Sequence, residues 1–259
     1  MKTPRGQVGL EDHCWGVILA GGDGTRLLSL TRKIHGEDRP KQFAAVFGSE
    51  TLLEQTRKRV ASLIPNSRIT YTLTRAHERF YQAQLASVPH WAKFEQPENR
   101  GTAHGVLFSL LRLKRLEPRA IVGFFPSDHH IANREAFRHE IGVAYEEAKA
   151  QRDRVVLVGI EPTSPETSYG WIERGEKSGR GHAVKRFCEK PDPITAASLM
   201  RAGCLWNGFI MVGYADAFLA LFEAALPELL NAFRAAESVS GKPEGHAAVE
   251  DLYRRTAAA

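Results

Sequence analysis

The 259-residue sequence has only three cysteines, Cys14, Cys188 and Cys204, which stand far apart and form no CxxC pair. An odd and sparse set of cysteines predicts neither a disulfide framework nor a zinc site, and it fits a reducing compartment. Long apolar runs are also missing, both for a membrane span and for the apolar segment of a signal peptide. We therefore expect a cytoplasmic protein without a membrane partner.

The sequence also lacks any block of lysine and arginine of the kind that binds nucleic acid. Its formal net charge of +5 comes from 35 basic and 30 acidic residues that are scattered along the chain. This modest excess suits a phosphorylated small ligand, and the scattering argues against a nucleic-acid partner. Hydrophobic residues make up 43% of the chain, which excludes a disordered chain and is enough for a sizeable core.

Short apolar runs alternate with amphipathic segments through the first 160 residues. The runs predict strands at 16–19, 69–73, 121–125 and 155–160. Helical spacing of apolar residues predicts helices at 52–63, 75–85, 102–115 and 135–150. Consecutive apolar residues are typical of strands that are covered on both faces. We therefore expect an α/β fold, a Rossmann-like and mostly parallel sheet flanked by helices, with right-handed crossovers.

The segments become shorter after about residue 160. The pattern predicts strands at 171–173, 183–188 and 204–212, and helices at 194–202, 215–226 and 229–237. The sequence shows no internal repeat and no long linker. We expect an N-terminal extension over residues 1–14 and one domain over 15–259, in which residues 15–160 bind the ligand of the glycine-rich loop and residues 161–259 add a smaller substrate lobe.

A glycine-rich segment, VILAGGDGTRL at 17–27, follows from the first strand. Bare backbone lets N–H groups approach a bulky anion, and Arg26 adds a permanent charge that matches phosphate oxygens. The segment matches neither common nucleotide motif, because Leu27 stands where a dinucleotide fingerprint needs its third glycine and no Walker sequence follows. We interpret it as a phosphate-binding loop at the carboxyl end of a strand. The alternative is a glycine turn that serves only the backbone.

Six further segments complete a series: RPKQF (39–43), QPENRGTA (96–103), FPSDHH (125–130), SYGW (168–171), FCEKP (187–191) and LWNGF (205–209). With the glycine-rich segment, they resemble the sugar-1-phosphate nucleotidyltransferases, most closely the mannose-1-phosphate guanylyltransferase (GDP-mannose pyrophosphorylase) branch, over residues 15–213. The resemblance implies an enzyme that joins a sugar 1-phosphate, such as mannose 1-phosphate, to a nucleoside triphosphate, such as GTP, and releases pyrophosphate. The attacking phosphate oxygen is already ionised at neutral pH, so such catalysis consists of alignment and charge neutralisation.

The resemblance also assigns roles to individual residues. The implied catalytic residues are Arg26, Lys41 and Asp128, and Asp128 would bind the implied cofactor, Mg²⁺. The implied nucleotide-binding residues are Leu19, Ala20, Gly21, Gly22, Gly24, Thr25, Gln96, Gly101 and Thr102. The implied sugar-phosphate-binding residues are Tyr169, Gly170, Glu189, Lys190 and Asn207.

The sequence departs from the family pattern at three places. Gly101 stands where the guanylyltransferases usually carry Asn, and Ser168 replaces a usual Gly. A segment of the type Trp-Ser-Asp-x-Gly, which supplies a second metal carboxylate in the family, does not occur before Ala259. The resemblance therefore predicts that the sequence is incomplete at its C-terminal end or that the protein has lost this part of the site.

Several alternatives stay open. A non-catalytic protein that senses a nucleotide or sugar phosphate would use the same fold. A glycosyltransferase would need a DxD metal motif, and residues 127–129 offer one carboxylate. A zinc site at Asp128, His129 and His130 is disfavoured because adjacent residues on extended backbone diverge. Trp171 and Trp206 fit a core better than a sugar platform, and a homo-oligomer stays open.

Overall fold

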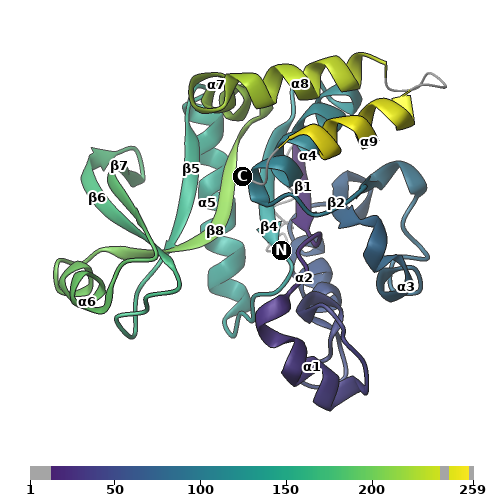
Figure 1. Cartoon of the computed structure of the whole chain (residues 1–259). Helices are drawn as coiled ribbons and strands as arrows, with labels where there is room; N and C mark the ends of the chain where they lie inside the picture. Colours follow the sequence, from purple (N-terminus) through teal and green to yellow (C-terminus); the bar gives the residue numbers. More distant parts are fainter. Residues whose placement is uncertain (1–12, 240–244, 257–259) are drawn as a thin grey trace, which may run out of the picture.

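The computed structural model describes residues 13–239 and 245–256, and the strands in these ranges form one sheet (Figure 1). They are β1 (Cys14–Leu19), β2 (Ile69–Thr74), β3 (Lys93–Gln96), β4 (Ile121–Pro126), β5 (Val155–Ile160), β6 (Gly170–Ser178), β7 (Gly181–Glu189) and β8 (Leu205–Tyr214). The order is β3-β2-β1-β4-β8-β6-β7, and β5 also pairs with β8. Strands β1 to β4 pair in parallel, whereas β8 runs antiparallel to β4, β5 and β6.

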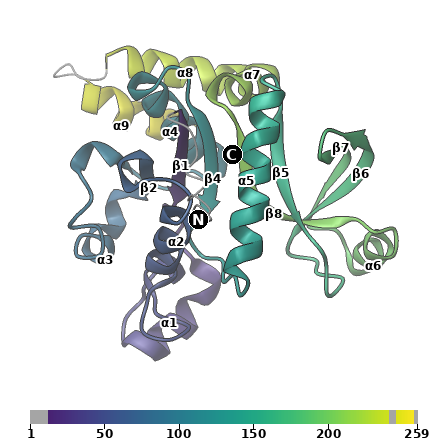
Figure 2. The same ribbon diagram turned by 180° about the vertical axis from the view of Figure 1, so that it is seen from behind.

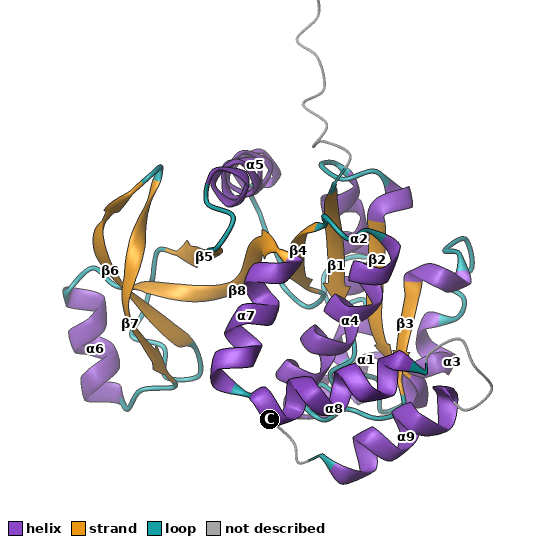
Figure 3. Cartoon of the chain, turned by 90° about the horizontal axis from the view of Figure 1, so that it is seen from above, coloured by secondary structure: helices purple, strands orange, loops and turns teal. Residues whose placement is uncertain are grey.

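Helices cover both faces of the sheet (Figure 3). They are α1 (Leu28–His35), α2 (Leu52–Ala61), α3 (Glu78–Tyr81), α4 (Thr102–Leu116), α5 (Arg134–Ala150), α6 (Pro193–Arg201), α7 (Ala215–Ala225), α8 (Pro227–Ser238) and α9 (Gly245–Arg255). Figure 2 shows α5 in front of the sheet, and α4, α7, α8 and α9 lie on the other side. Neighbouring residues of β1 point to opposite faces: Ile18 joins the core of α2 and α5, and Val17 joins the core of α4 and α8. No helix of the described residues is long and apolar enough to cross a membrane.

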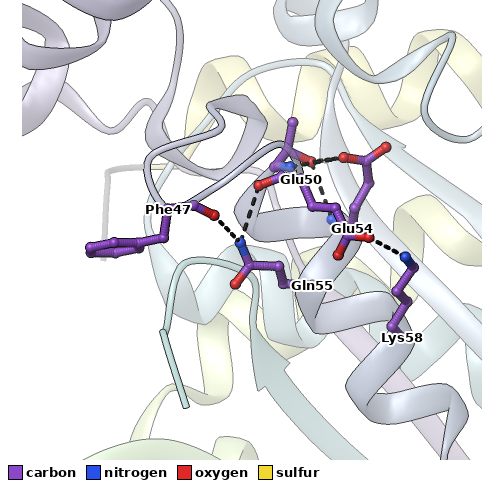
Figure 4. Close-up of polar contacts among 6 residues, drawn as sticks. Phe47, Glu50, Glu54, Gln55 and Lys58 are labelled. Carbon is purple, nitrogen blue, oxygen red and sulfur yellow. Dashed lines mark hydrogen bonds and ion pairs between the residues drawn. The ribbon is translucent and has the colours of Figure 1, made fainter. Parts of the chain in front are cut away.

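The start of α2 is fixed by polar contacts (Figure 4). Thr51 caps the helix, and its side chain accepts from the Glu54 N–H while the Glu54 carboxylate accepts from the Thr51 N–H. Gln55 Nε2 donates to the carbonyls of Phe47 (3.2 Å) and Glu50 (3.1 Å). These bonds tie α2 to the loop that follows the RPKQF segment.

A smaller lobe stands apart from the helices α1 to α3 (Figure 1). It consists of the hairpin β6–β7, helix α6 and the beginning of β8. Its own small core contains Trp171, Ala196, Leu199 and Cys204. Strand β8 continues from this lobe into the central sheet, so it joins the two parts.

The expected α/β fold with a mostly parallel sheet is confirmed, and three details differ from the sequence predictions. The strand order, which was not predicted, places the antiparallel β8 between β4 and β5. The helix expected at 75–85 is limited to a 3₁₀ turn and the four residues of α3. Strand β3 and helix α1 were not predicted, since β3 has four residues and α1 has only one buried residue. Strand β1 begins at Cys14, inside the expected extension, and residues 1–12 and 257–259 lie outside the described residues.

Candidate functional site

A cavity of about 410 Å³ opens beyond the carboxyl ends of β1 and β4. The predicted site residues that line it are Leu19, Gly21, Gly22, Gly24, Arg26, Lys41, Gln96, Gly101, Thr102 and Asp128. Two predicted nucleotide residues do not line it: Ala20 is buried (1% exposed), and Thr25 begins a 3₁₀ turn. The cavity lies where parallel strands of an α/β sheet end, which is the usual place for a ligand.

Two glycines of the 17–27 segment are required by close packing. A Cβ atom on Gly21 would lie 2.7 Å from Gln96 Nε2, and a Cβ atom on Gly24 would lie 2.8 Å from the backbone nitrogen of Lys41. Gly24 also has a φ of 62°, which glycine adopts readily. The glycine loop therefore lies directly against the segments that carry Gln96 and Lys41.

Gln42 holds the glycine loop from behind. Its buried side chain donates from Nε2 to the carbonyls of Ala20 (3.1 Å) and Gly22 (2.6 Å). Gln42 therefore satisfies these two carbonyl oxygens on the side of the protein. The space beside Gly22 is open, since an added Cβ atom there would meet nothing within 4 Å. This arrangement leaves bare backbone at the cavity, as an anion site requires.

Lys41 and Asp128 both line the cavity and form an ion pair with each other. Asp128 follows the end of β4, where Ser127 Oγ donates to the Leu19 carbonyl (2.6 Å) and so ties β4 to β1. Arg26 lies exposed at the same cavity. Two cations and one carboxylate thus surround the open space beside the glycine loop.

Mg²⁺ fits this donor set in one way. No group of three or more His, Cys, Asp or Glu side chains that could hold a metal occurs within residues 13–239 and 245–256. Asp128 is the one carboxylate among the described residues that line the cavity. Mg²⁺ is commonly held by one or two carboxylates together with substrate phosphates and water, so Asp128 fits an ion that arrives with a triphosphate.

Gln96 lines the cavity and is oriented by α9. Its buried Oε1 accepts a hydrogen bond from the Tyr253 hydroxyl (2.9 Å), and its Nε2 lies 3.4 Å from the Leu73 carbonyl. Tyr253 is itself fully buried, and burial raises the pKa of its hydroxyl, which stays protonated as a donor. The amide therefore has one defined orientation.

Gly101, which stands where the resemblance expects Asn, has a backbone conformation that suits glycine. It has φ 93° and ψ −179°, a conformation that is essentially restricted to glycine. Its N–H donates to Asn99 Oδ1 (3.0 Å), and no side chain caps the following helix α4. Helix α4 thus presents its first N–H groups near Thr102 at the cavity, and an asparagine at position 101 would be strained.

Asp23 connects three segments around the cavity, a role that the sequence analysis missed. Its carboxylate accepts from Asn99 Nδ2 (2.9 Å) and lies 3.2 Å from His77 Nε2. His77 packs edge-on against Phe43 of the RPKQF segment, with ring centroids 5.9 Å apart. Burial lowers the pKa of His77, and the Asp23 carboxylate partly offsets this change. The glycine loop, the RPKQF segment and the QPENRGTA segment are therefore held together.

The predicted sugar-phosphate residues lie together in the smaller lobe, and none of them lines the cavity. Gly170 pairs with Glu189 between β6 and β7, and the Lys190 N–H donates to the Tyr169 carbonyl (3.2 Å). Lys190 Nζ lies 3.2 Å from Glu189 Oε1, and both side chains are more than half exposed. Their contact with a sugar phosphate stays a prediction.

Asn207 links this lobe to the cavity. Its Oδ1 accepts from the Phe209 N–H (3.0 Å) and supports a left-handed backbone at Phe209, whose φ is 52°. Phe209 in turn lines the cavity. Trp171 is fully buried and donates to the Glu166 carbonyl (2.8 Å), which confirms it as core. Trp206 is half-buried and packs edge-on against Tyr169, with ring centroids 5.2 Å apart.

The cavity also contains residues to which the sequence analysis gave no role: Gln42, Thr72, Asn99, Gly105, Pro126, Ser127, His129 and Phe209. Most of them lie inside the segments that carried the resemblance. Their position in the sequence therefore marked them as candidates, although their residue types did not assign them a role. Thr72 is different, because it lies within a strand and nothing in its surroundings in the sequence marks it.

Comparison with known proteins gives the same family for most of the chain. The sequence profile of the nucleotidyl transferase family matches residues 15–240. The xanthan biosynthesis protein XanB of Xanthomonas campestris pv. campestris (strain B100) is 33% identical over 220 residues, which cover 83% of this chain and 45% of that protein. The mannose-1-phosphate guanylyltransferase RfbM of Salmonella typhimurium is 34% identical over 224 residues, which cover 83% of this chain and 45% of that protein.

A solved structure shows the same architecture. A mannose-1-phosphate geranyltransferase from Thermus thermophilus superposes with a TM-score of 0.82 at 30% identity, and the match covers 95% of this chain and 69% of that one. The chain thus spans about half the length of the two curated relatives that it matches.

Proposed function

The chain belongs to the nucleotidyl transferase family, and we propose that it joins a sugar 1-phosphate to a nucleoside triphosphate and releases pyrophosphate. We further propose that the sugar is mannose and the nucleotide GTP, because a similar protein is a mannose-1-phosphate guanylyltransferase. The observation that carries the proposal is the cavity in which Arg26, Lys41 and Asp128 surround a bare glycine loop. We extend the proposal to the cytoplasm, since a sparse, odd set of three cysteines that stand far apart in the sequence fits a reducing compartment.

The reaction does not require a general base from the protein. The phosphate oxygen of the sugar phosphate is ionised at neutral pH and can attack the α-phosphorus directly, and pyrophosphate leaves on the opposite side. The chain must therefore align the two ligands and neutralise the charge that shifts onto the leaving pyrophosphate. Arg26 and Lys41, with the N–H groups of the glycine loop, are the groups that would do so.

Lys41 and Asp128 exchange partners in this scheme. In the structure the two side chains form an ion pair with each other. When a triphosphate enters with Mg²⁺, Asp128 would hold the metal ion, which offsets charge on the phosphate oxygens. Lys41 would then bind a phosphate oxygen in place of the carboxylate. Gln96, the backbone of Gly101 and the first turn of α4 would hold the base end of the nucleotide.

One observation favours a second candidate function. Asp128 is the sole carboxylate on the described cavity lining, and Lys41 already neutralises it. A site with one carboxylate can bind a nucleotide with its metal ion but holds that ion less firmly for turnover. A non-catalytic protein that binds a nucleotide or sugar phosphate is therefore the alternative.

A matrix assay tests the proposal. The purified chain is incubated with Mg²⁺, one of GTP, ATP, UTP or dTTP, and either mannose 1-phosphate or glucose 1-phosphate, and pyrophosphate release is measured. We expect release with GTP and mannose 1-phosphate to exceed that of every other pair, and to require the sugar phosphate. Saturable nucleotide binding without pyrophosphate from any pair would instead support the binding protein.

A further inference from the structure

Arg59 is a buried cation that has no role in the chemistry proposed above. It lies on α2, its side chain is almost entirely buried, and only 7% of the residue is exposed. No carboxylate among the described residues forms an ion pair with its guanidinium. Burial, and then the charge of Arg134, lower the pKa of Arg59 to about 10, so it stays protonated at neutral pH.

The guanidinium contacts the strand end that carries Asp128. Its Nη2 donates to Thr56 Oγ1 (2.8 Å) on its own helix and to the carbonyl of His129 (3.1 Å). Its Cζ lies 5.5 Å from the ring centre of Phe137 on α5. Arg59 therefore bridges α2 and the residue that directly follows Asp128.

Residues 126–129 separate Arg59 from the candidate site. Pro126 and His129 line the 410 Å³ cavity on one side, and on the other they line a second space of about 10 Å³ beside Arg59. Asp128 and its partner Lys41 belong to the first side. The helix that carries Arg59 is itself fixed at its start by the capping box of Thr51 and Glu54 (Figure 4). The segment is thus held from behind by a side chain on a fixed helix.

Stability alone does not account for an arginine at this position. The surroundings are mostly apolar, since Val60, Phe125, Ile131, Phe137 and Ile210 line the small space. A buried charge without a counter-ion lowers stability, and an apolar side chain of similar length is often as good or better in such a place. Residues that cost stability are expected where function requires them.

We propose that Arg59 is a positioning residue, which holds residues 126–129 through the His129 carbonyl so that Asp128 faces Lys41 and the incoming phosphates. The inference rests on the proposed function for its effect on turnover, but the hold on the segment is a property of the chain alone. Arginine suits the task because its planar fork reaches the His129 carbonyl and the Thr56 hydroxyl from one nitrogen while its Cζ lies over the ring of Phe137.

The chain offers a matched control on the same helix. Arg57 also donates to a carbonyl and a hydroxyl, those of Gln84 (3.2 Å) and Ser87 (2.9 Å), but it does not line either cavity. We compare Arg59→Met with Arg57→Met, and we use Arg59→Lys as the conservative variant. For each we measure kcat and KM with GTP and mannose 1-phosphate, the thermal midpoint, and amide hydrogen exchange over residues 127–131. The Ser127 N–H, which donates to the Leu19 carbonyl (3.2 Å), is a sensitive reporter there.

We expect Arg59→Met to keep a thermal midpoint at or above that of Arg57→Met, to lower kcat by about tenfold or more with little change in KM, and to exchange faster over 127–131. Arg59→Lys should recover part of kcat, and Arg57→Met should keep kcat and the exchange of 127–131 at wild-type levels. Unchanged exchange in Arg59→Met, or a kcat equal to that of Arg57→Met, would overturn the proposal.

Two further outcomes are informative. If Arg59→Met does not fold, Arg59→Lys decides: faster exchange over 127–131 with lower kcat supports the positioning role, and wild-type values of both overturn it. If the wild-type chain makes no pyrophosphate, the proposed function fails, while the exchange comparison still shows whether Arg59 holds the segment.

Discussion

Asp128 and Lys41 are the residues whose pairing has the most direct chemical consequence. Each side chain satisfies the charge of the other at the cavity. A phosphate group must therefore compete with a carboxylate for Lys41 unless a metal ion occupies that carboxylate. This competition makes nucleotide binding and metal binding dependent on each other.

Asp128→Asn should consequently strengthen the binding of a phosphate chain when no metal is present. We expect the affinity for inorganic tripolyphosphate in EDTA to rise several-fold, because Lys41 loses its competitor, while pyrophosphate release with Mg²⁺ falls by roughly a hundredfold. Isothermal titration calorimetry gives the first value and the coupled assay the second. Lys41→Met in the same background is the control, and it should abolish the gain. An affinity that does not rise in Asp128→Asn would show that the ion pair does not restrain Lys41.

Lys41→Ala and Arg26→Ala should each lower turnover much more than stability. Both side chains line the cavity and neither is buried, so truncation costs little folding free energy. Loss of a charge that acts on the transition state typically costs about 100-fold in kcat. Arg32→Ala, which removes an exposed arginine bonded to Asp38 (2.7 Å), is the control and should leave kcat unchanged. Near-normal rates in either cavity variant would remove that residue from the proposed catalytic set.

The sequence allowed some of these residues to be predicted and not others, for a physical reason. Arg26, Lys41 and Asp128 stand in short segments whose local composition is unusual, so a resemblance could single them out. Arg59, Asp23 and Tyr253 act through partners that are distant in the sequence. Nothing local distinguishes Arg59 from Arg57, two residues earlier on the same helix, although only one of them reaches His129.

At the scale of elements, helix α9 supports a side chain that lines the cavity, that of Gln96. Tyr253 donates to Gln96 Oε1 (2.9 Å), and α9 packs with α8 against α4. Arg75 at the end of β2 also forms an ion pair with Glu250 of α9. A helix at the end of the described chain thus orients an amide that lines the candidate nucleotide site.

Tyr253→Phe should test this support. The substitution leaves the buried side-chain oxygen of Gln96, Oε1, without its hydrogen-bond donor, which costs about 1–3 kcal/mol of unfolding free energy. We also expect a higher KM for GTP, because the amide loses its fixed orientation. Urea unfolding of Tyr253→Phe, Gln96→Leu and the double variant forms a double-mutant cycle. Additive losses would mean that the hydrogen bond contributes nothing, whereas we expect a coupling of about 1 kcal/mol.

The junction of α4 with α8 and α9 should also make stability depend on pH. His104 is fully buried against Phe233 and Tyr253, with Nε2 2.8 Å from Thr256 Oγ1. Burial, and then the charge of Arg100, lower the pKa of His104 below the usual 6.5. As the pH falls, the unfolded chain therefore takes up a proton before the folded chain does. The stabilising effect of the neutral imidazole is complete above about pH 6.5 and decreases from there toward the folded-state pKa.

His104→Gln should flatten this dependence. We expect the unfolding free energy of the wild type to fall as the pH drops below about 6.5, by no more than about 1.4 kcal/mol per pH unit for each proton, and less steeply in the variant. The slope does not vanish, because burial also lowers the pKa values of His77 and His129. His139→Gln on the exposed side of α5 is the control for the substitution itself. Equal slopes in wild type and His104→Gln would contradict the assignment.

Element prediction succeeded where burial leaves a clear pattern and failed where tertiary pairing decides. Strand β4 is buried at every position and its apolar run was evident, whereas β3 alternates over only four residues. The place of β5 could not be predicted, because β8 reaches the gap between β4 and β5 only after the chain has built the lobe of β6, β7 and α6. Segment order in the sequence contains no signal for such an insertion.

At the scale of the whole molecule, the candidate residues for the two proposed ligands lie in different parts of the described chain. The cavity at β1 and β4 contains the phosphate-binding candidates, and the hairpin β6–β7 with β8 contains the candidates for the sugar phosphate. Strand β8 connects them, since Asn207 in the lobe supports the backbone of Phe209 at the cavity. Binding of one ligand should therefore be separable from binding of the other by single substitutions.

Lys190→Ala should weaken binding of the sugar phosphate and leave GTP binding nearly intact. Its side chain is 60% exposed and its charge is partly met by Glu189 (3.2 Å), so the fold does not depend on it. Lys190 already has a φ of 43°, and alanine bears a similar backbone cost there. A lost hydrogen bond to a charged group is worth about 1.5–3 kcal/mol, or roughly tenfold or more in Kd. Calorimetry with each ligand alone measures both affinities. Lys185→Ala is the control on the same hairpin, because Lys185 also pairs with a glutamate, Glu173 (2.6 Å). Equal loss of both affinities in Lys190→Ala would reject the division, because it would mean that one side chain serves both ligands.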